Sequence, residues 1–343
     1  MKLAPIAARL TAQGLDGPPM ARPEEVAERL LAVQGQDPRG ARLAVRARTE
    51  GLTAADVDRA LTEDRSLLIT WLNRGTLHLV RSEDYPWLQA LTTPPQLNSS
   101  ATRLSQEGVT SGMAERGVET IERALAEEGP LTRPQLRERL DSAGVPTAGQ
   151  ALVHLLFRAA LRGIAVRGPM VGKEHAYVLT RDWLGPQRPV DRDAALAELA
   201  RRYLAGHGPA DDRDLARWAG LPLRDSRAGL AAIGSELDER DDGLVDLAKR
   251  RPPAELPGPR LLGAFDPLLL GWVSREEVVG PHKMLVTSNG IFRPFALVGA
   301  RAVATWRFNA GQVSIEHLGK VTKKVAAALE ADARAVEHYL GGG

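Results

Sequence analysis

The sequence predicts an α+β fold that is mainly α-helical. Tandem winged helix-turn-helix motifs are expected to lead into a small C-terminal antiparallel β-rich region and a closing helix. One observation is that three helices followed by a β-hairpin are predicted twice between about residues 112 and 254, which is the plan of a winged helix-turn-helix motif. Another is that short alternating strands with glycine-bearing turns replace helices from Leu261 onward.

Each predicted element follows from apolar periodicity and from the turn residues that bound it. The first copy has predicted helices over 119–128, 132–140 and 150–162, and a hairpin over 164–168 and 176–180. The second copy has predicted helices over 194–205, 212–219 and 224–233, and a hairpin over 236–240 and 244–247. The N-terminal third is interpreted in the same way, with helices over 23–34, 38–49 and 53–62, and a strand over 76–80. The linkers are expected at 92–112, 184–191 and 250–260.

The C-terminal region is expected to form a small meander closed by a helix. Its strands are predicted over 284–288, 291–298, 301–309 and 312–318, and its helix over 321–339. The chain is therefore divided into three winged-helix units over 1–105, 106–190 and 191–256, followed by a β-rich region over 257–343.

Composition excludes several classes of protein. The chain has 343 residues, of which 43% are hydrophobic, and this fraction excludes general disorder. The absence of cysteine excludes disulfides, thiolate zinc sites, iron–sulfur clusters and cysteine nucleophiles. No apolar run suits a membrane helix and Met1–Gly14 does not resemble a signal peptide, so we expect a cytoplasmic protein without membrane partners. We also expect a monomer. A net charge of +2 does not by itself indicate a nucleic-acid-binding protein.

The usual catalytic signatures are missing. The seven histidines lie too far apart in the sequence to form a local helical metal pair, and there is no phosphate-loop glycine pattern or nucleophile elbow. The acidic run Asp211-Asp-Arg-Asp214 is at a predicted helix start, where aspartates cap free amides. We therefore expect no metal and no cofactor.

The segment Ala32–Gly40 contains two glutamines in a predicted tight turn. A helix is expected to end near Gln34 because Gly35 suits a left-handed exit, and Asp37-Pro38 is predicted to be the N-cap and first residue of the next helix. Gln34 and Gln36 would then lie together in this elbow. The spacing is also compatible with two amides that only satisfy backbone groups.

A second polar group lies in the stretch Ser66–Val80. Its last strand would place Thr76 and His78 on one face and apolar residues on the other. Arg74, Thr76 and His78 could therefore contact phosphates. The alternative is that Arg74 and His78 are ordinary surface or satisfied polar groups.

Six motifs occur in an order typical of a known family. They are Leu31-Ala-Val-Gln-Gly-Gln-Asp-Pro-Arg39, Asp58-Arg-Ala-Leu61, Trp71-Leu-Asn-Arg-Gly-Thr-Leu-His78, Glu83-Asp-Tyr-Pro-Trp87, Phe265-Asp-Pro-Leu-Leu-Leu-Gly271 and Gly290-Ile-Phe-Arg-Pro294. The chain resembles the bacterial winged-helix DNA glycosylases of the AlkZ and YcaQ type from about residue 20 to 310. The resemblance implies a C-shaped DNA-binding scaffold that removes alkylated bases, and in some members unhooks interstrand crosslinks.

In this family a glutamine, aliphatic, glutamine motif carries catalysis, and a variant branch ends in aspartate. The resemblance therefore implies Gln34 and Gln36 as catalytic residues of the AlkZ branch, although Gly35 replaces the aliphatic residue. An N7- or N3-alkylated purine is cationic and leaves without a proton, so neutral amides can suffice. Because no lysine lies near the elbow in sequence, we expect a monofunctional hydrolase without lyase activity.

The implied partner is double-stranded DNA that carries alkylated bases, in general repair or in self-resistance to a toxin. The resemblance therefore also implies a nucleoid-associated protein. We expect DNA contacts from Arg39, from Arg74, Thr76 and His78, and from Lys283 and Arg293 beside an Asn289-Gly290 hairpin. The hairpin could instead be ordinary core, with Ile291, Phe292 and Phe295 buried. The alternative function is a non-catalytic winged-helix DNA-binding protein such as a transcriptional regulator.

Overall fold

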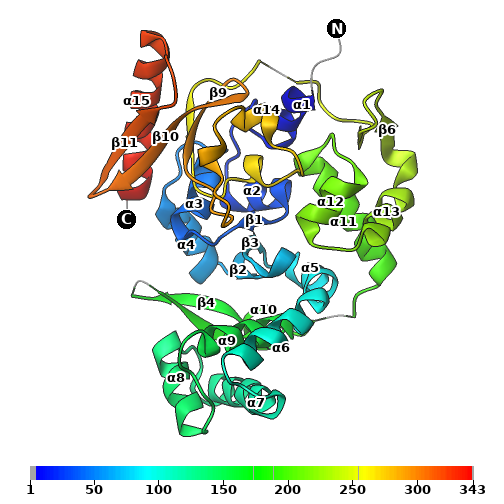
Figure 1. Cartoon of the computed structure of the whole chain (residues 1–343), viewed down its shortest axis with the longest axis vertical. Helices are drawn as coiled ribbons and strands as arrows, with labels where there is room; N and C mark the ends of the chain where they lie inside the picture. The colour runs from blue at the N-terminus through cyan, green and yellow to red at the C-terminus, as the bar shows by residue number, and fades with distance from the viewer. Residues whose placement is uncertain (1–4, 173, 188, 254, 342–343) are drawn as a thin grey trace. The chain divides into compact units, whose positions relative to one another are not determined.

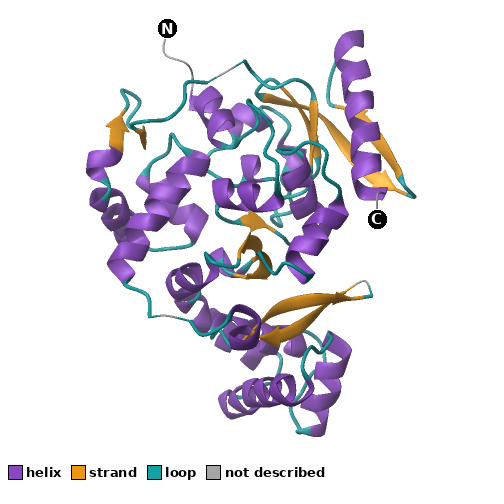
Figure 2. Ribbon diagram, turned by 180° about the vertical axis from the view of Figure 1, so that it is seen from behind, coloured by secondary structure: helices purple, strands orange, loops and turns teal. Residues whose placement is uncertain are grey.

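The computed structural model describes residues 5–172, 174–187, 189–253 and 255–341. It is mainly helical with small antiparallel sheets, as expected from the sequence (Figures 1 and 2). The chain forms two compact units. Unit 1 combines the residues up to Val57 with those from Leu196 onward, and unit 2 is the continuous stretch Asp58–Ala195. The four-segment organisation stays a prediction.

The N-terminal part of unit 1 consists of short helices and one very short strand. They are α1 (Pro5–Ala12), α2 (Pro23–Leu30), β1 (Val33–Gln34), α3 (Pro38–Arg46) and the start of α4 (Ala54–Thr62). Pro23 begins α2 with its fixed φ, and Glu24 and Glu25 lie in its first turn, where they complement the helix dipole.

Unit 2 contains the first predicted copy of three helices and a hairpin. The copy consists of α7 (Ser111–Glu128), α8 (Arg133–Ser142), α9 (Ala151–Leu161), β4 (Ala165–Val171) and β5 (Glu174–Leu179). The other elements of the unit are β2 (Leu67–Trp71), η1 (Asn73–Gly75), β3 (Leu77–Arg81), α5 (Tyr85–Thr92), η2 (Pro94–Gln96), α6 (Leu97–Gln106) and α10 (Thr180–Leu184). Strands β2 and β3 pair antiparallel, with Thr70 opposite His78. A shared core that includes Ile121, Leu136 and Leu155 joins α7, α8 and α9.

The second copy lies in unit 1 apart from the first residues of its first helix. It consists of α11 (Arg192–His207), α12 (Asp212–Ala219), α13 (Leu223–Ala232), η3 (Gly234–Glu236), β6 (Leu237–Glu239) and β7 (Val245–Leu247). Asp211 caps α12, because its carboxylate accepts the Asp214 backbone N–H at 2.7 Å. The capping interpretation of this acidic run is therefore confirmed.

The C-terminal region of unit 1 is a four-stranded antiparallel sheet in the order β11-β10-β9-β8. Its elements are β8 (Arg260–Leu262), η4 (Pro267–Leu269), α14 (Glu276–Val279), η5 (Lys283–Leu285), β9 (Phe295–Val298), β10 (Arg301–Asn309), β11 (Gln312–His317) and α15 (Lys323–Gly341). Helix α15 lies along β10 and β11 (Figure 1). Trp306 of β10, Leu329 of α15 and Leu43 of α3 share one core, so α3 is packed against this region.

The structure corrects three predicted boundaries. Helix α2 ends at Leu30, before Gln34, and the residue with positive φ is Leu31 (62°) rather than Gly35. The expected linker 92–112 contains η2, α6 and the start of α7. Helix α6 is packed against the protein through buried Ser100 and Leu104. The segment 284–288 is a 3₁₀ turn and a loop rather than a strand, and β9 begins only at Phe295.

Candidate active site

The two glutamines lie between α2 and α3 in an elbow, here defined as residues 31–37. Leu31 adopts a left-handed conformation that turns the chain out of α2, and its side chain is fully buried. Val33 and Gln34 then form β1, and Asp37 begins the turn into α3. Helix α2 is anchored by its buried stripe of Val26, Ala27 and Leu30, which fixes the start of the elbow.

The amides of the two glutamines are joined by a hydrogen bond. Nε2 of Gln34 donates to Oε1 of Gln36 at 2.5 Å. Gln34 is only 6% exposed, whereas Gln36 is exposed. The bond uses one lone pair of the Gln36 carbonyl oxygen, and the NH₂ group of Gln36 donates to no described residue. A buried glutamine thus orients an exposed one.

Asp37 fixes the other end of the elbow. Its Oδ1 accepts the backbone N–H groups of Arg39 at 2.8 Å and Gly40 at 2.9 Å, and Pro38 occupies the first turn of α3. This confirms the predicted N-cap. The carboxylate also lies at the positive end of the α3 dipole, where it is stabilising.

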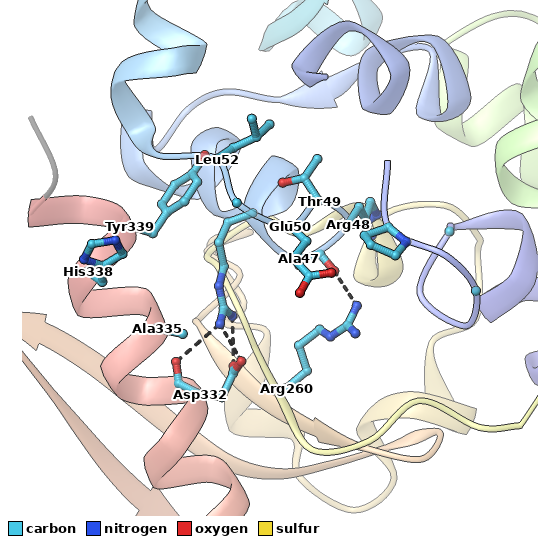
Figure 3. A pocket seen from close by; sticks show the side chains of 15 residues that line it. Ala47, Arg48, Thr49, Glu50, Leu52, Arg260, Asp332, Ala335, His338 and Tyr339 are labelled. Atoms are coloured by element: carbon cyan, nitrogen blue, oxygen red, sulfur yellow. Dashed lines mark hydrogen bonds and ion pairs between the residues drawn. The ribbon is translucent and has the colours of Figure 1, made fainter. Parts of the chain in front are cut away.

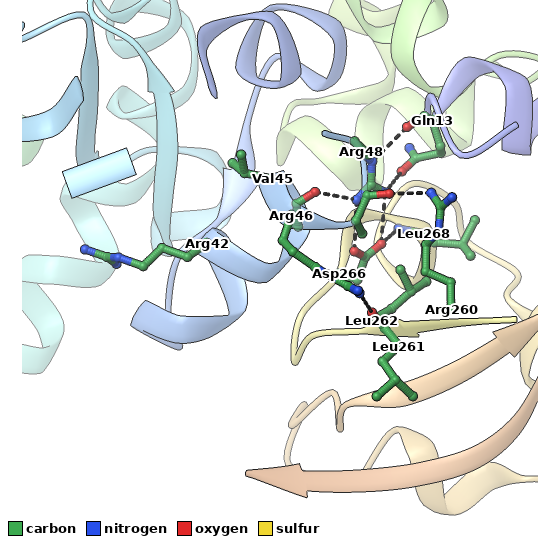
Figure 4. A network of polar contacts seen from close by, with 12 residues as sticks. Gln13, Arg42, Val45, Arg46, Arg48, Arg260, Leu261, Leu262, Asp266 and Leu268 are labelled. Atoms are coloured by element: carbon green, nitrogen blue, oxygen red, sulfur yellow. Dashed lines mark hydrogen bonds and ion pairs between the residues drawn. The ribbon is translucent and has the colours of Figure 1, made fainter. Parts of the chain in front are cut away.

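The buried ion pair Arg48–Asp266 holds the C-terminal end of α3. Two guanidinium nitrogens of Arg48 lie 3.0 Å from the two Asp266 oxygens, and both side chains have zero exposure. Arg48 also donates to the Gln13 backbone and side chain (Figure 4). The sequence motif around Phe265 contained this aspartate, but nothing in its spacing connected it to Arg48.

The backbone of α3 also packs closely against the Gly263–Phe265 segment. A Cβ added to Gly40 would lie 2.3 Å from the Ala264 carbonyl oxygen, so only glycine fits there. Exposed Arg39, in the first turn of α3, donates to the Phe308 carbonyl at 3.3 Å and lies over the Phe308 ring. Arg39 therefore links the first turn of α3 to β10.

The Asn289-Gly290 turn lies in a short hairpin loop. The Thr287 N–H donates to the Ile291 carbonyl at 3.0 Å and the Arg293 N–H to the Leu285 carbonyl at 2.9 Å, while Gly290 adopts positive φ. Lys283 and Arg293 are exposed.

The apolar side chains of this loop face in different directions. Met284 and Ile291 are 55% and 52% exposed, whereas Phe292 is buried and packs against Phe265. Phe295, in β9, is fully buried. The core interpretation is thus right for the two phenylalanines and wrong for Ile291.

In unit 2, Arg74 and Thr76 lie in and beside η1, and His78 lies in β3. Arg74 adopts positive φ (57°), and the Thr76 hydroxyl donates to the Asn73 carbonyl at 3.1 Å. His78 is 2% exposed, and burial, with a further effect of the Arg74 charge, lowers its pKa to about 3. The imidazole is therefore neutral at physiological pH and almost wholly covered, and its Nδ1 lies 2.9 Å from the Thr76 carbonyl oxygen, which favours the alternative of a satisfied polar group over the expected phosphate contact.

The described part of the chain contains neither a metal-binding cluster nor a membrane helix. Within residues 5–172, 174–187, 189–253 and 255–341, no three acidic or histidine side chains lie close enough to hold a metal ion. Over the same ranges, no helix is long and apolar enough to cross a membrane.

Comparison with known proteins gives a consistent family. The model of the DNA glycosylase AlkZ-like family matches residues 27–339. The interstrand DNA cross-link repair glycosylase of Streptomyces sahachiroi is 30% identical over 307 residues, covering 82% of this chain and 81% of that protein. The solved structure of the Streptomyces sahachiroi DNA glycosylase AlkZ superposes with a TM-score of 0.81 at 27% identity, covering 98% of this chain and 95% of that one. The chain therefore belongs to the AlkZ-like family of DNA glycosylases.

Proposed function

We propose that this glycosylase hydrolyses the N-glycosidic bond of cationic alkylated purines in double-stranded DNA, with Gln34 and Gln36 as its catalytic residues. The observation that carries the proposal is the 2.5 Å hydrogen bond from buried Gln34 to exposed Gln36 beside the N-terminus of α3. It gives a solvent-facing amide a fixed orientation without any charged group. Preorganised dipoles of this kind stabilise a transition state because they need no reorganisation.

Neutral amides suit a leaving group that is already activated. A purine alkylated at N7 or N3 carries positive charge and departs as a neutral base, so no general acid is required. The exposed NH₂ group of Gln36 can hold the oxygen of the attacking water. The carbonyl oxygens are the negative ends of the two amide dipoles, and these ends can face the developing sugar cation.

Asp37 is a carboxylate beside this pair, and its Oδ1 is engaged in capping α3. In this position it offsets the positive end of the helix dipole, which would otherwise oppose a developing cation. Asp37 is therefore a positioning residue in the proposal.

For DNA holding we propose Arg39 on α3, Arg74 and Thr76 in unit 2, and Lys283 and Arg293 on the hairpin loop. Exposure of Arg39, Lys283 and Arg293 supports phosphate contact. The Streptomyces sahachiroi relative is named as an interstrand cross-link repair glycosylase, so we extend the proposed substrates to crosslinks made through purine nitrogens.

The test is base release by the purified protein from duplexes that contain 7-methylguanine, 3-methyladenine or unmodified guanine. The proposal expects excision of both cationic bases and little release of guanine, with abasic sites left uncleaved. Binding to a defined duplex sequence without release of either methylated base would contradict it.

A further inference from the structure

A pocket of about 490 Å³ lies in unit 1, at the end of α3 opposite the glutamine elbow. Its wall is formed by Arg46 and the following residues to Leu52, by Arg260 at the start of β8, and by one face of α15 (Figure 3). Its volume lies in the range of small-molecule sites, which run from roughly 300 to 1,000 Å³.

Three arginines (Arg46, Arg48 and Arg260) and two carboxylates (Glu50 and Asp332) line this pocket, and Asp266, outside the lining, pairs with Arg48. Asp332 of α15 pairs with Arg46 and also accepts the Leu261 N–H at 2.6 Å. Asp266 uses both oxygens on Arg48 and also accepts the Leu268 N–H at 2.9 Å. The carboxylates of Asp332 and Asp266 are therefore fully engaged by other groups.

Arg260 is the guanidinium without such a partner. Its Nη1 donates to the carbonyl of Ala47 at the end of α3, and within the described ranges no carboxylate pairs with it. Burial lowers the pKa of Arg260, the carboxylates of Asp332 and Asp266 oppose that shift, and the charges of Arg48 and Arg46 add to it. Because Arg46 and Arg48 each have a carboxylate partner, Arg260 is the partly buried guanidinium of the three that favours an anionic ligand.

We propose that this pocket binds a phosphate group, with Arg260 as its anchor. A guanidinium has five N–H donors in a planar fork that matches phosphate, and only one of those of Arg260 is engaged by a described residue. The bond from Arg260 also satisfies the carbonyl end of α3, which would otherwise repel an anion. The lining also includes exposed Glu50, which opposes the positive charge, and exposed His338.

The phosphate can come from a small phosphate ester or from the DNA backbone. The volume of the pocket accommodates a group of nucleoside monophosphate size. Because α3 carries the elbow at one end and lines the pocket at the other, the proposed site is separate from the glutamine pair but lies on the same helix.

The experiment measures binding of inorganic phosphate and of deoxyadenosine monophosphate to the full chain by calorimetry and by ³¹P line broadening. The variants are Arg260→Gln, which removes the charge, and Ala335→Phe, which narrows the pocket from α15. Arg334→Gln is the control for loss of an arginine charge. Exposed Arg334 lies on α15, next to Ala335, but lines a different pocket. Melting curves establish that each variant is folded.

Saturable phosphate binding that falls at least tenfold in Arg260→Gln and is unchanged in Arg334→Gln would support the site. Ala335→Phe should weaken the mononucleotide more than inorganic phosphate, and it decides the matter if Arg260→Gln does not fold. Weaker binding of undamaged duplex by Arg260→Gln, with a shallower salt dependence, would identify the DNA backbone as the source. Unchanged duplex binding with lost mononucleotide binding would identify a free ester. Absence of saturable binding of either probe, or equal binding by all variants, would overturn the proposal.

Discussion

Removing the two glutamines separately should give unequal effects, because one is buried and the other exposed. Gln36→Ala removes only the exposed amide, so we expect little change in stability. Excision of 7-methylguanine should fall roughly ten- to a thousandfold, a loss of about 1.4 to 4 kcal/mol of transition-state stabilisation. Gln34→Ala removes the partner that orients Gln36 as well as its own amide. We therefore expect it to reduce excision at least as much.

The burial of Gln34 also sets the expected cost in stability. A side chain that is 6% exposed and hydrogen-bonded contributes about 1 to 2 kcal/mol to unfolding free energy, whereas an exposed one contributes almost nothing. Because the two amides are bonded to each other, their effects on excision should not add. The loss of transition-state stabilisation in the double mutant should be smaller than the sum of the two single-mutant losses by about 1 kcal/mol.

The assay is single-turnover release of 7-methylguanine from a synthetic duplex, followed by alkaline cleavage of the abasic site. Urea unfolding of each variant separates stability from catalysis. Gln312→Ala is the matched control, because it removes an exposed glutamine at the start of β11. If the double mutant excises 7-methylguanine nearly as fast as the parent protein, the catalytic assignment is refuted. If the losses of the two single mutants add up to that of the double mutant, the orienting role of Gln34 is refuted.

Three further predictions concern the scaffold and the DNA contacts. Asp266→Asn leaves the Arg48 charge buried without its partner, so unfolding free energy in urea should fall by about 3 to 5 kcal/mol; a loss below about 1 kcal/mol would contradict the anchoring role. Arg74→Ala should weaken binding to many duplex sequences alike and reduce the slope of log affinity against log salt by about one, whereas a loss confined to one sequence would favour specific readout. Shortening the hairpin loop and replacing Lys283 and Arg293 should reduce excision while the melting temperature stays within a few degrees, and normal excision would show that the loop is only scaffold.

Much of the fold was predictable because its helices carry clear boundary signals. Helix α12 and strand β10 have the residues that were predicted for them. The Asn, Ser and Thr residues of α6 are typical of loops and predict a linker there. Leu104 nevertheless packs into the core of unit 2. Tertiary packing stabilises that helix, and local composition does not show it.

The end of α2 was misplaced for a related reason. Local preference puts a left-handed residue at glycine, so Gly35 was expected to end the helix. The structure has the positive φ at Leu31, which is completely buried. Leu31 thus adopts a backbone conformation that leucine disfavours in isolation, in a place where its side chain is buried.

The candidate site was predictable only where its residues are neighbours in sequence. Gln34, Gln36 and the Asp37 cap fall within one motif, whereas Arg48 and Asp266 are 218 residues apart and have no shared local pattern. The burial of His78 was also missed. Strand alternation predicts two faces, but it does not say whether both of them are covered.

The discontinuous make-up of unit 1 has a consequence for synthesis on the ribosome. Residues 58–195 are contiguous and can fold as soon as they emerge, whereas α3 must wait for Asp266 and for the sheet that packs on Leu43. Until then Arg48 lacks its buried carboxylate, and the elbow has no rigid helix behind it. A nascent chain that already contains both glutamines therefore has the sequence motif but not yet the packed helix that follows the pair.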